Sequence, residues 1–241
     1  MTLTEDSMLL VTTYVHEGVV MASDSRLVAT LASETQPEAP DSSNATLLSD
    51  SQTFIYLATN NTAIGIGAAR SVIGHHIQTF IAGHCSGKKV FVAQIASELF
   101  QYLRQLRPIP EVVLHVAGYD DKSDKEVWNL EVALNRLSRV NEGRHSGIIY
   151  SGIATGDVIE KLLLPAGELD RDGKLVRPFP YYDLGLEGLS LQDAIDLSVF
   201  LIHAQSEVER FQCRPKKTGG PIDVILIQPG GATWIRKKEL H

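Results

Sequence analysis

A glycine-rich stretch in the first third of the chain has residue types that could bind an anion. It reads Gly-Ile-Gly-Ala-Ala-Arg from Gly65 to Arg70, after an apolar strand pattern and before a helical one. In nucleotide-binding proteins such a loop follows a strand of a βαβ unit and cradles phosphate at the start of a helix. Here Arg occupies the sixth position and the preceding strands form a hairpin, so we interpret the stretch as a close strand-to-helix turn. Its N–H groups could still be offered to an anion or a peptide carbonyl.

Histidine and cysteine residues between positions 75 and 85 raise the question of a metal site. His76 and Cys85 are nine residues apart, as are His75 and His84. Neither pair has the i, i+4 spacing of metal ligands on a helix, and no second ligand cluster appears. We therefore expect no metal and no other cofactor. Cys85 and Cys213 are far apart in the sequence, so a disulfide framework is not expected either.

Hydrophobic periodicity predicts the elements that would position such residues. The predicted strands span residues 9–15, 19–23, 53–58, 62–67, 112–117, 126–133, 148–151, 222–228 and 232–236. The predicted helices span about 71–84, 91–106, 157–164 and 191–211, the last with Ser190 as N-cap. Segregated strands and helices indicate an α+β fold. Apolar helices need sheet faces to cover, which favours a helix–sheet–sheet–helix sandwich.

One stretch interrupts this pattern. Residues 31–50 contain two prolines among small polar and acidic residues, which predicts an exposed, flexible loop. Because loops accept added length at small entropic cost, we interpret this one as a tolerated insertion. Elsewhere the sequence shows no domain boundary and no internal repeat, so we expect a single domain over residues 1–241.

Composition and charge narrow the class of partner. Hydrophobic residues make up 44% of the chain and charged residues 21%, which is ordinary for a globular protein with a substantial core. The net charge of −7 argues against nucleic acid as the main partner. The acidic N-terminal residues do not resemble a signal peptide, and no apolar run approaches the roughly 18 residues of a membrane span. We expect a cytoplasmic protein without a membrane partner, and solvated basic clusters at 216–217 and 236–238.

Four short motifs, in the same order along the chain, resemble segments of proteasome β-type subunits. The run Gly-Val-Val-Met-Ala-Ser-Asp-Ser-Arg at 18–26 resembles a strand in which a hairpin glycine leads to Asp-Ser-Arg. Residues 63–69 are similar to the strand that ends in the family's glycine turn. Tyr150-Ser151-Gly152 is similar to its Ser-Gly segment, and 218–227 resembles its glycine pair and closing strand. The chain is therefore identified as similar to the proteasome-like family of Ntn (N-terminal nucleophile) hydrolases.

The resemblance implies a four-layer αββα sandwich packed into stacked rings, with copies of itself or related subunits as partners and a peptide as ligand. In this family the first residue of the mature chain is the nucleophile. An N-terminal Thr supplies a hydroxyl, and its own α-amine, with a pKa near 8, takes the proton. A lysine adjusts the local charge, and backbone N–H groups at the glycine turn stabilise the oxyanion. The matched positions here are Asp24, Ser151 and Thr218 for the catalytic cluster, and Gly67 and Ala68 for the turn.

The sequence departs from this pattern at its most important positions. Alignment on Gly18 and Asp24 places Met8 where the nucleophile belongs, and Met cannot attack a carbonyl. The lysine position falls on Thr53, and the earliest lysine in the chain is Lys88. Near the C-terminus, Pro215 stands near the place of another family Asp, and Thr218 replaces a Ser. These departures predict a catalytically silent subunit that contributes a structural or binding surface.

Two alternatives stay open. Processing that exposes Thr2, Thr4 or Ser7 would create an active amidohydrolase, although a shift by one residue to Ser7 would reverse every side chain of the strand. A binding module that uses the ancestral cleft for a peptide or a small anion is the third interpretation. Asp24 is either a remnant of the catalytic cluster or a carboxylate that caps backbone N–H groups at a strand end, paired with Arg26. We favour the capping role.

Overall fold

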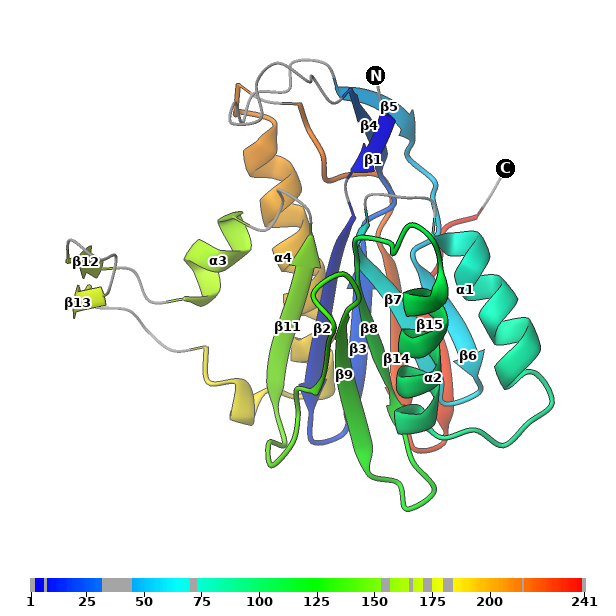
Figure 1. Cartoon of the computed structure of the whole chain (residues 1–241). Helices are drawn as coiled ribbons and strands as arrows, with labels where there is room; N and C mark the ends of the chain where they lie inside the picture. Colours follow the sequence, from blue (N-terminus) through cyan, green and yellow to red (C-terminus); the bar gives the residue numbers. More distant parts are fainter. Residues whose placement is uncertain are drawn as a thin grey trace.

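Figure 1 shows the computed structural model of the chain. It describes residues 3–6, 8–31, 45–69, 73–152, 157–164, 167–170, 175–179, 184–213 and 215–239. Over these residues the protein is a mixture of antiparallel sheets and helices, which confirms the predicted α+β class. No helix in the described ranges is both long enough and apolar enough to cross a membrane.

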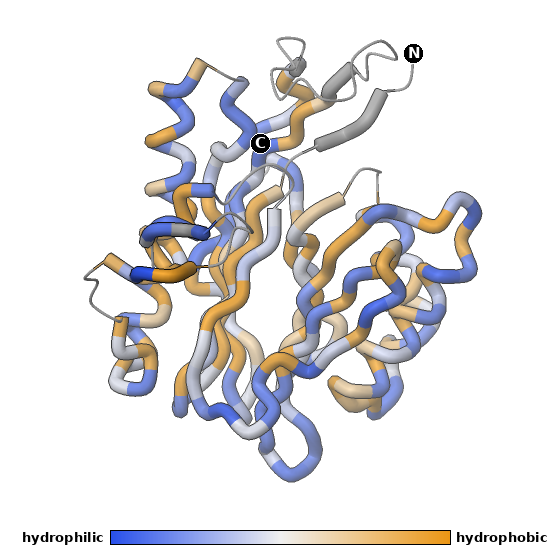
Figure 2. The backbone as a smooth tube through the Cα atoms, turned by 60° about the vertical axis from the view of Figure 1, so that its left-hand side comes forward, coloured by the Kyte–Doolittle hydropathy of each residue, from blue (hydrophilic) through white to orange (hydrophobic). Residues whose placement is uncertain are grey.

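Two five-stranded antiparallel sheets form the centre of the molecule. One has the order β11–β2–β3–β14–β15, made of Gly147–Gly152, Leu9–Val15, Gly18–Ser23, Asp223–Gln228 and Gly231–Arg236. The other has the order β10–β9–β8–β7–β6, made of Arg136–Arg139, Lys125–Glu131, Val112–Tyr119, Thr62–Ala69 and Ile55–Thr59. Both contain hairpins that the sequence predicts, and hydrophobic stretches run along their strands in Figure 2.

Helices pack on one face of each sheet. α1 (Gly74–Phe80), its π-helical continuation η1 (Ile81–Cys85) and α2 (Val92–Gln105) bury apolar side chains against the β6–β10 sheet. α3 (Asp157–Leu163) and α4 (Leu191–Glu209) pack against the β2–β3–β14 face of the other sheet. Figure 1 shows α1 and α2 on one side of the strands and α4 on the other. Ser190 and Asp193 form a reciprocal capping box at the start of α4, as the sequence predicts.

A third hydrophobic cluster fills the space between the two sheets. It joins side chains such as Leu10 and Met21 from one sheet to Ala117 and Val127 from the other. Gly65 brings the sheets close here, because a Cβ at this position would lie 2.7 Å from atoms of both Leu10 and Met21. Each sheet therefore has helices on one face and the other sheet on its opposite face.

The prediction of a loop over residues 31–50 is wrong at both ends of this stretch. Leu31 closes β4 (Leu27–Leu31), and Ala45–Ser49 form β5; together with β1 (Leu3–Asp6) they make a small antiparallel sheet of order β1–β4–β5. The acidic, proline-containing middle of this stretch, 32–44, lies outside the described residues. The Ala-Thr-Leu-Leu-Ser segment is extended because β4 supplies its hydrogen-bonding partners, which the local composition does not reveal.

Three further differences between the predicted and the observed elements concern additional short elements and the extent of one helix. A two-stranded sheet of β12 (Gly167–Leu169) and β13 (Leu175–Pro178), and the short strand β10, were not expected. A 3₁₀ turn, η2 (Leu186–Gly188), precedes α4. The predicted helix at 71–84 is α-helical only from Gly74 to Phe80 and then widens into the π-helix, while 70–72 lie outside the described residues.

A buried ion pair anchors the segment that follows β15. Lys238 Nζ contacts the Asp223 carboxylate, and the Lys238 backbone N–H donates to Asp223 Oδ1 at 2.8 Å. The side chains of Lys238 and Asp223 are only 4% and 1% exposed. The expectation of a solvated cluster at 236–238 is therefore wrong for Lys238, because its ammonium has a carboxylate partner inside the fold.

Replacement of one partner should cost much more than replacement of both. Lys238→Met leaves the Asp223 carboxylate buried without its cation, which we expect to lower the free energy of unfolding by about 3–5 kcal/mol. Lys238→Met combined with Asp223→Asn removes the stranded charge while the amide oxygen can still accept the Lys238 N–H, so most of this loss should be recovered. Urea unfolding of the three proteins measures the difference. Equal losses in the single and double variants would contradict the account.

Candidate functional site

Asp24 lies directly after β3 and is fully buried. Its Oδ1 accepts from the Leu9 N–H and its Oδ2 from the Gly219 N–H, both at 2.9 Å. The Asp24 N–H in turn donates to the Leu9 carbonyl at 3.2 Å. The carboxylate therefore joins the start of β2, the end of β3 and the segment before β14. This geometry supports the capping role that we favoured for Asp24.

Burial raises the pKa of Asp24 to about 7, against the lowering effect of the backbone N–H groups that it accepts from. The Asp24–Arg26 pairing that we expected is not the principal contact of the guanidinium. Instead Arg26 makes a two-pronged ion pair with Asp50, with Nε–Oδ1 at 2.6 Å and Nη2–Oδ2 at 2.9 Å. The Arg26 side chain lies against Gly219, where a Cβ would sit 2.8 Å from its Cζ, so a larger residue there would have to displace the guanidinium.

Thr218 is buried and fully engaged in the fold. Its N–H and hydroxyl both donate to the buried carboxylate of Glu209, at 2.7 and 3.0 Å, and the same carboxylate accepts from the Lys217 N–H and from Gln205. Glu209 was not predicted as a site residue, because it sits in a helix whose other acidic side chains are solvated. Asp24 and Glu209 together hold the 217–219 segment in place. A hydroxyl used in this way positions backbone and is not available as a nucleophile.

Met8 stands immediately before β2 and is only 4% exposed. Its side chain belongs to the cluster beneath α1 and α2, with Phe54, Ile66 and Ile73. The position that the resemblance assigns to a nucleophile therefore holds an apolar core residue. At the position assigned to the lysine, the Thr53 carbonyl accepts a hydrogen bond from the Tyr56 hydroxyl at 3.0 Å.

Gly67 and Ala68 lie inside β7, so the turn expected at these two residues is wrong, whereas their oxyanion role stays a prediction. β7 continues to Ala69 because β8 goes on pairing with it, through an irregularity between Ile66 and Ala68. Gly67 faces the other sheet: a Cβ there would be 2.4 Å from the Ser151 Cβ. Ser151, near the end of β11 and opposite Leu10 of β2, is thus in direct contact with β7.

His115 is the residue that sequence reasoning missed. It lies in β8 and is fully buried, with its Nε2 2.8 Å from Ser151 Oγ and its Nδ1 2.8 Å from Thr12 Oγ1. Burial lowers the pKa of His115 to about 3, so the ring is neutral at physiological pH. A neutral imidazole carries one N–H, so one hydroxyl donates to the ring and the other accepts from it. The only signal in the sequence was a single His within an otherwise apolar strand run.

The residues predicted for the site therefore divide into two groups along β2. Asp24 and Thr218 belong to a backbone-anchoring group with Glu209, at the start of β2. Ser151 and Gly67 belong to the second group, with His115 and Thr12, between the sheets. Over the described part of the chain, His, Cys, Asp and Glu side chains form no group of three or more that could hold a metal ion.

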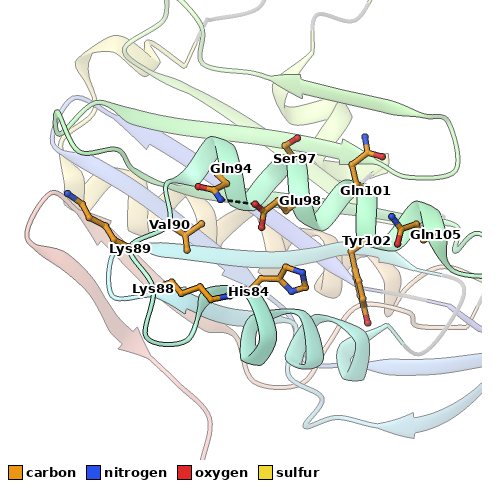
Figure 3. A pocket seen from close by; sticks show the side chains of 10 residues that line it. All are labelled: His84, Lys88, Lys89, Val90, Gln94, Ser97, Glu98, Gln101, Tyr102 and Gln105. Carbon is orange, nitrogen blue, oxygen red and sulfur yellow. Dashed lines mark hydrogen bonds between the residues drawn. The ribbon is translucent and has the colours of Figure 1, made fainter.

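A groove of about 550 Å³ lies apart from both groups, between η1 and α2 (Figure 3). His84, one of the residues weighed as metal ligands, lines it together with Lys88 and Tyr102. The His84 ring stacks on Phe80 with centroids 4.6 Å apart, and its Nδ1 lies 3.2 Å from the Phe80 carbonyl. Lys88 Nζ donates to the Gly83 carbonyl at 2.9 Å. These side chains stabilise the end of the widened helix.

The buried His115 should make stability depend on pH. A histidine titrates near 6.5 in an unfolded chain, but in the fold the pKa of His115 is about 3. Between these values the unfolded state binds more protons, so the free energy of unfolding falls as the pH falls, by up to about 1.4 kcal/mol per pH unit. His115→Gln keeps a neutral side chain with donor and acceptor and should remove this contribution, so that the slopes of the two proteins differ by about that amount between pH 6.5 and 5.

Denaturant unfolding at several pH values measures the slope. Asp24, whose pKa is raised from 3.8 to about 7, contributes a slope of opposite sign, which is common to both proteins and cancels in the comparison. His203→Gln, at an exposed position of α4, is the matched control and should leave the slope unchanged. An identical slope in His115→Gln and the parent protein would show that His115 is not the group responsible.

Comparison with known proteins assigns no function to these two groups. No family model matches the chain, and no curated protein matches it. The resemblance to proteasome-like subunits therefore rests on the ordered motifs, and what it implies for this chain is a proposal.

Proposed function

We propose that this chain is a single-domain, cytoplasmic, proteasome-like subunit without N-terminal-nucleophile activity, and that it acts as a structural or binding member of an oligomeric assembly. The observation that carries the proposal is the buried Met8 at the position of the family's nucleophile. The two stacked antiparallel sheets with helices on their outer faces support an αββα sandwich of the Ntn-hydrolase type. The net charge of −7 suits the cytoplasmic location.

The chemistry of an N-terminal nucleophile needs a hydroxyl and a free α-amine on one residue. Met8 offers neither, since its side chain is a thioether packed in the core and its amine is bonded to the preceding residue. Among the alternatives, Thr4 lies in β1, where it pairs with Thr30 of β4, and Thr2 and Ser7 lie outside the described residues. No described contact favours an active site at Thr4, so the silent subunit is the better-supported function.

An apolar surface on α4 supports assembly with other subunits. Phe200 is 55% exposed on α4, and Phe211, just beyond its end, is 81% exposed. Next to Phe200 a groove of about 330 Å³ runs between α4 and β15, lined mainly by apolar side chains that include Ile195, Val199 and Ile235. Single exposed apolar residues are normal on a protein surface, but a contiguous set over one helix and the neighbouring edge strand indicates an interaction site. Packing of this surface against another subunit would remove it from water.

The oligomeric state tests this surface. We expect the purified protein to form a complex of several copies, and Phe200→Asp to shift it towards monomer, because a buried interface cannot accommodate an unpaired carboxylate. Size-exclusion chromatography with light scattering gives the mass. Val176→Asp, at an exposed position of β13, is the control and should assemble as the parent protein does. A parent protein that is monomeric at all concentrations would overturn the assembly proposal.

Loss of the N-terminal nucleophile is tested by an electrophile. A peptide epoxyketone forms a stable ring only with an amine and a hydroxyl on the same N-terminal residue, so the purified protein should give no adduct by intact mass spectrometry. An active threonine-type peptidase treated in parallel confirms the reagent. An adduct mapped to Thr2, Thr4 or Ser7 would replace the silent subunit with the active amidohydrolase.

A further inference from the structure

Three side chains from three different strands form one continuous hydrogen-bonded chain between the sheets. Ser151 Oγ is 2.8 Å from His115 Nε2, and His115 Nδ1 is 2.8 Å from Thr12 Oγ1. Thr12 and His115 are fully buried, whereas Ser151 is partly exposed. If Thr12 accepts from Nδ1–H, the opposite nitrogen is free to take the serine proton. This is the order of nucleophile, base and orienting group that activates a hydroxyl.

A mainly apolar pocket of about 360 Å³ opens beside this chain. Its wall includes Val113, which lies two residues before His115 in β8 and therefore on the same face of the strand. Ala68, another wall residue, directly follows Gly67, the residue in contact with Ser151. Ala68 and Val113 are paired across β7 and β8, so the pocket lies next along these two strands from the Ser151–His115 pair, which does not itself line it.

A buried amide oxygen of Asn129 is a second indication that a ligand binds here. Asn129 lies directly opposite His115 in the β8–β9 ladder. Its Oδ1 is buried and has no hydrogen-bond partner among the described residues, while its Nδ2 donates to Glu131 at 3.1 Å. Buried acceptors without a partner are rare because each costs desolvation energy. An N–H or hydroxyl of a bound compound would satisfy this oxygen.

We propose that Ser151 is a nucleophile, with His115 as its base and Thr12 as a positioning residue, and that it takes acyl or phosphonyl groups from compounds with a short apolar chain. This chemistry is independent of the chain's N-terminus and goes beyond the proposed function. In the step, Ser151 Oγ forms a bond to the acyl carbon or phosphorus. The leaving group departs with its bonding electrons, and the serine proton passes to His115 Nε2.

The same environment of His115 limits the rate at which Ser151 attacks an electrophile. A pKa near 3 means that the protonated ring formed in this step is disfavoured, and Thr12 carries no charge to stabilise it. We therefore expect slow modification by a strong electrophile and not rapid turnover of esters. The apolar wall should favour small alkyl groups over charged ones.

A small alkyl fluorophosphonate is the probe, because fluoride is its leaving group and the product is a stable serine phosphonate. Intact mass and peptide mapping should find one adduct, on Ser151. Ser151→Ala should abolish it, and Ser97→Ala, at an exposed position of α2, should retain it. An unmodified parent protein, or an adduct that persists in Ser151→Ala, would overturn the proposal.

The roles of His115 and Thr12 are tested by the labelling rate. His115→Gln, which lacks a proton-accepting nitrogen, should slow labelling, by less than the roughly 100-fold that a base with a pKa near neutral contributes. Thr12→Val should slow it while preserving side-chain shape, and Thr12→Ser, which restores the hydroxyl, should recover it. Equal rates in Thr12→Val and Thr12→Ser would remove Thr12 from the proposal. Because the epoxyketone reads only the N-terminal residue and the fluorophosphonate reads Ser151, failure of one proposal is distinguishable from failure of the other.

Discussion

The Asp24 carboxylate is the interaction on which the rest of the structure depends. Its two oxygens accept N–H groups from Leu9 and Gly219, which are separated from it by 15 and 195 residues in the sequence. A carboxylate without these partners would be costly in such a buried place, and its raised pKa shows that desolvation still outweighs them. The contact sets where β2 begins, where β3 ends and how the chain enters β14. With those three central strands aligned, β11 and β15 can pair at the edges.

The alignment of β2 also decides what faces the second sheet. Along one face, Leu10 and Thr12 point towards β7 and β8, where Gly65 and Gly67 leave room for close approach. Along the other face, Leu9 and Val11 pack beneath α4. A shift of β2 by one residue would exchange these faces and break both the core and the Thr12–His115–Ser151 chain. β2, which begins directly after the buried Met8, is therefore tightly constrained along its length.

The two groups of polar residues differ in what they can do. Asp24, Thr218 and Glu209 use their hydrogen-bonding capacity on backbone and on one another, so they serve the fold. Ser151 is partly exposed to solvent and has a neutral imidazole at hydrogen-bonding distance. Its hydroxyl is therefore the one that we propose as a nucleophile. The sheet-to-sheet packing that positions this serine is needed for the fold in any case. The apolar surface of α4 lies on the helix-covered side of the β11–β15 sheet, whereas the pocket is lined by residues in and next to β7, β8 and β9 of the other sheet.

The sequence by itself determined the order of the elements, the hairpins and the α+β class, because hydrophobic periodicity and turn residues act over a few neighbouring positions. That Met8 and Thr53 stand at the positions of a nucleophile and a lysine follows only from the resemblance to proteasome-like subunits and stays a prediction. Only the tertiary structure decided that Lys238 is buried against Asp223, that residues 45–49 form a strand, and that His115 meets Thr12 and Ser151. The physical reason is distance along the chain. His115 is 103 residues from Thr12 and 36 from Ser151, so their contact depends on the register of each sheet and on how the sheets stack, which no local pattern encodes.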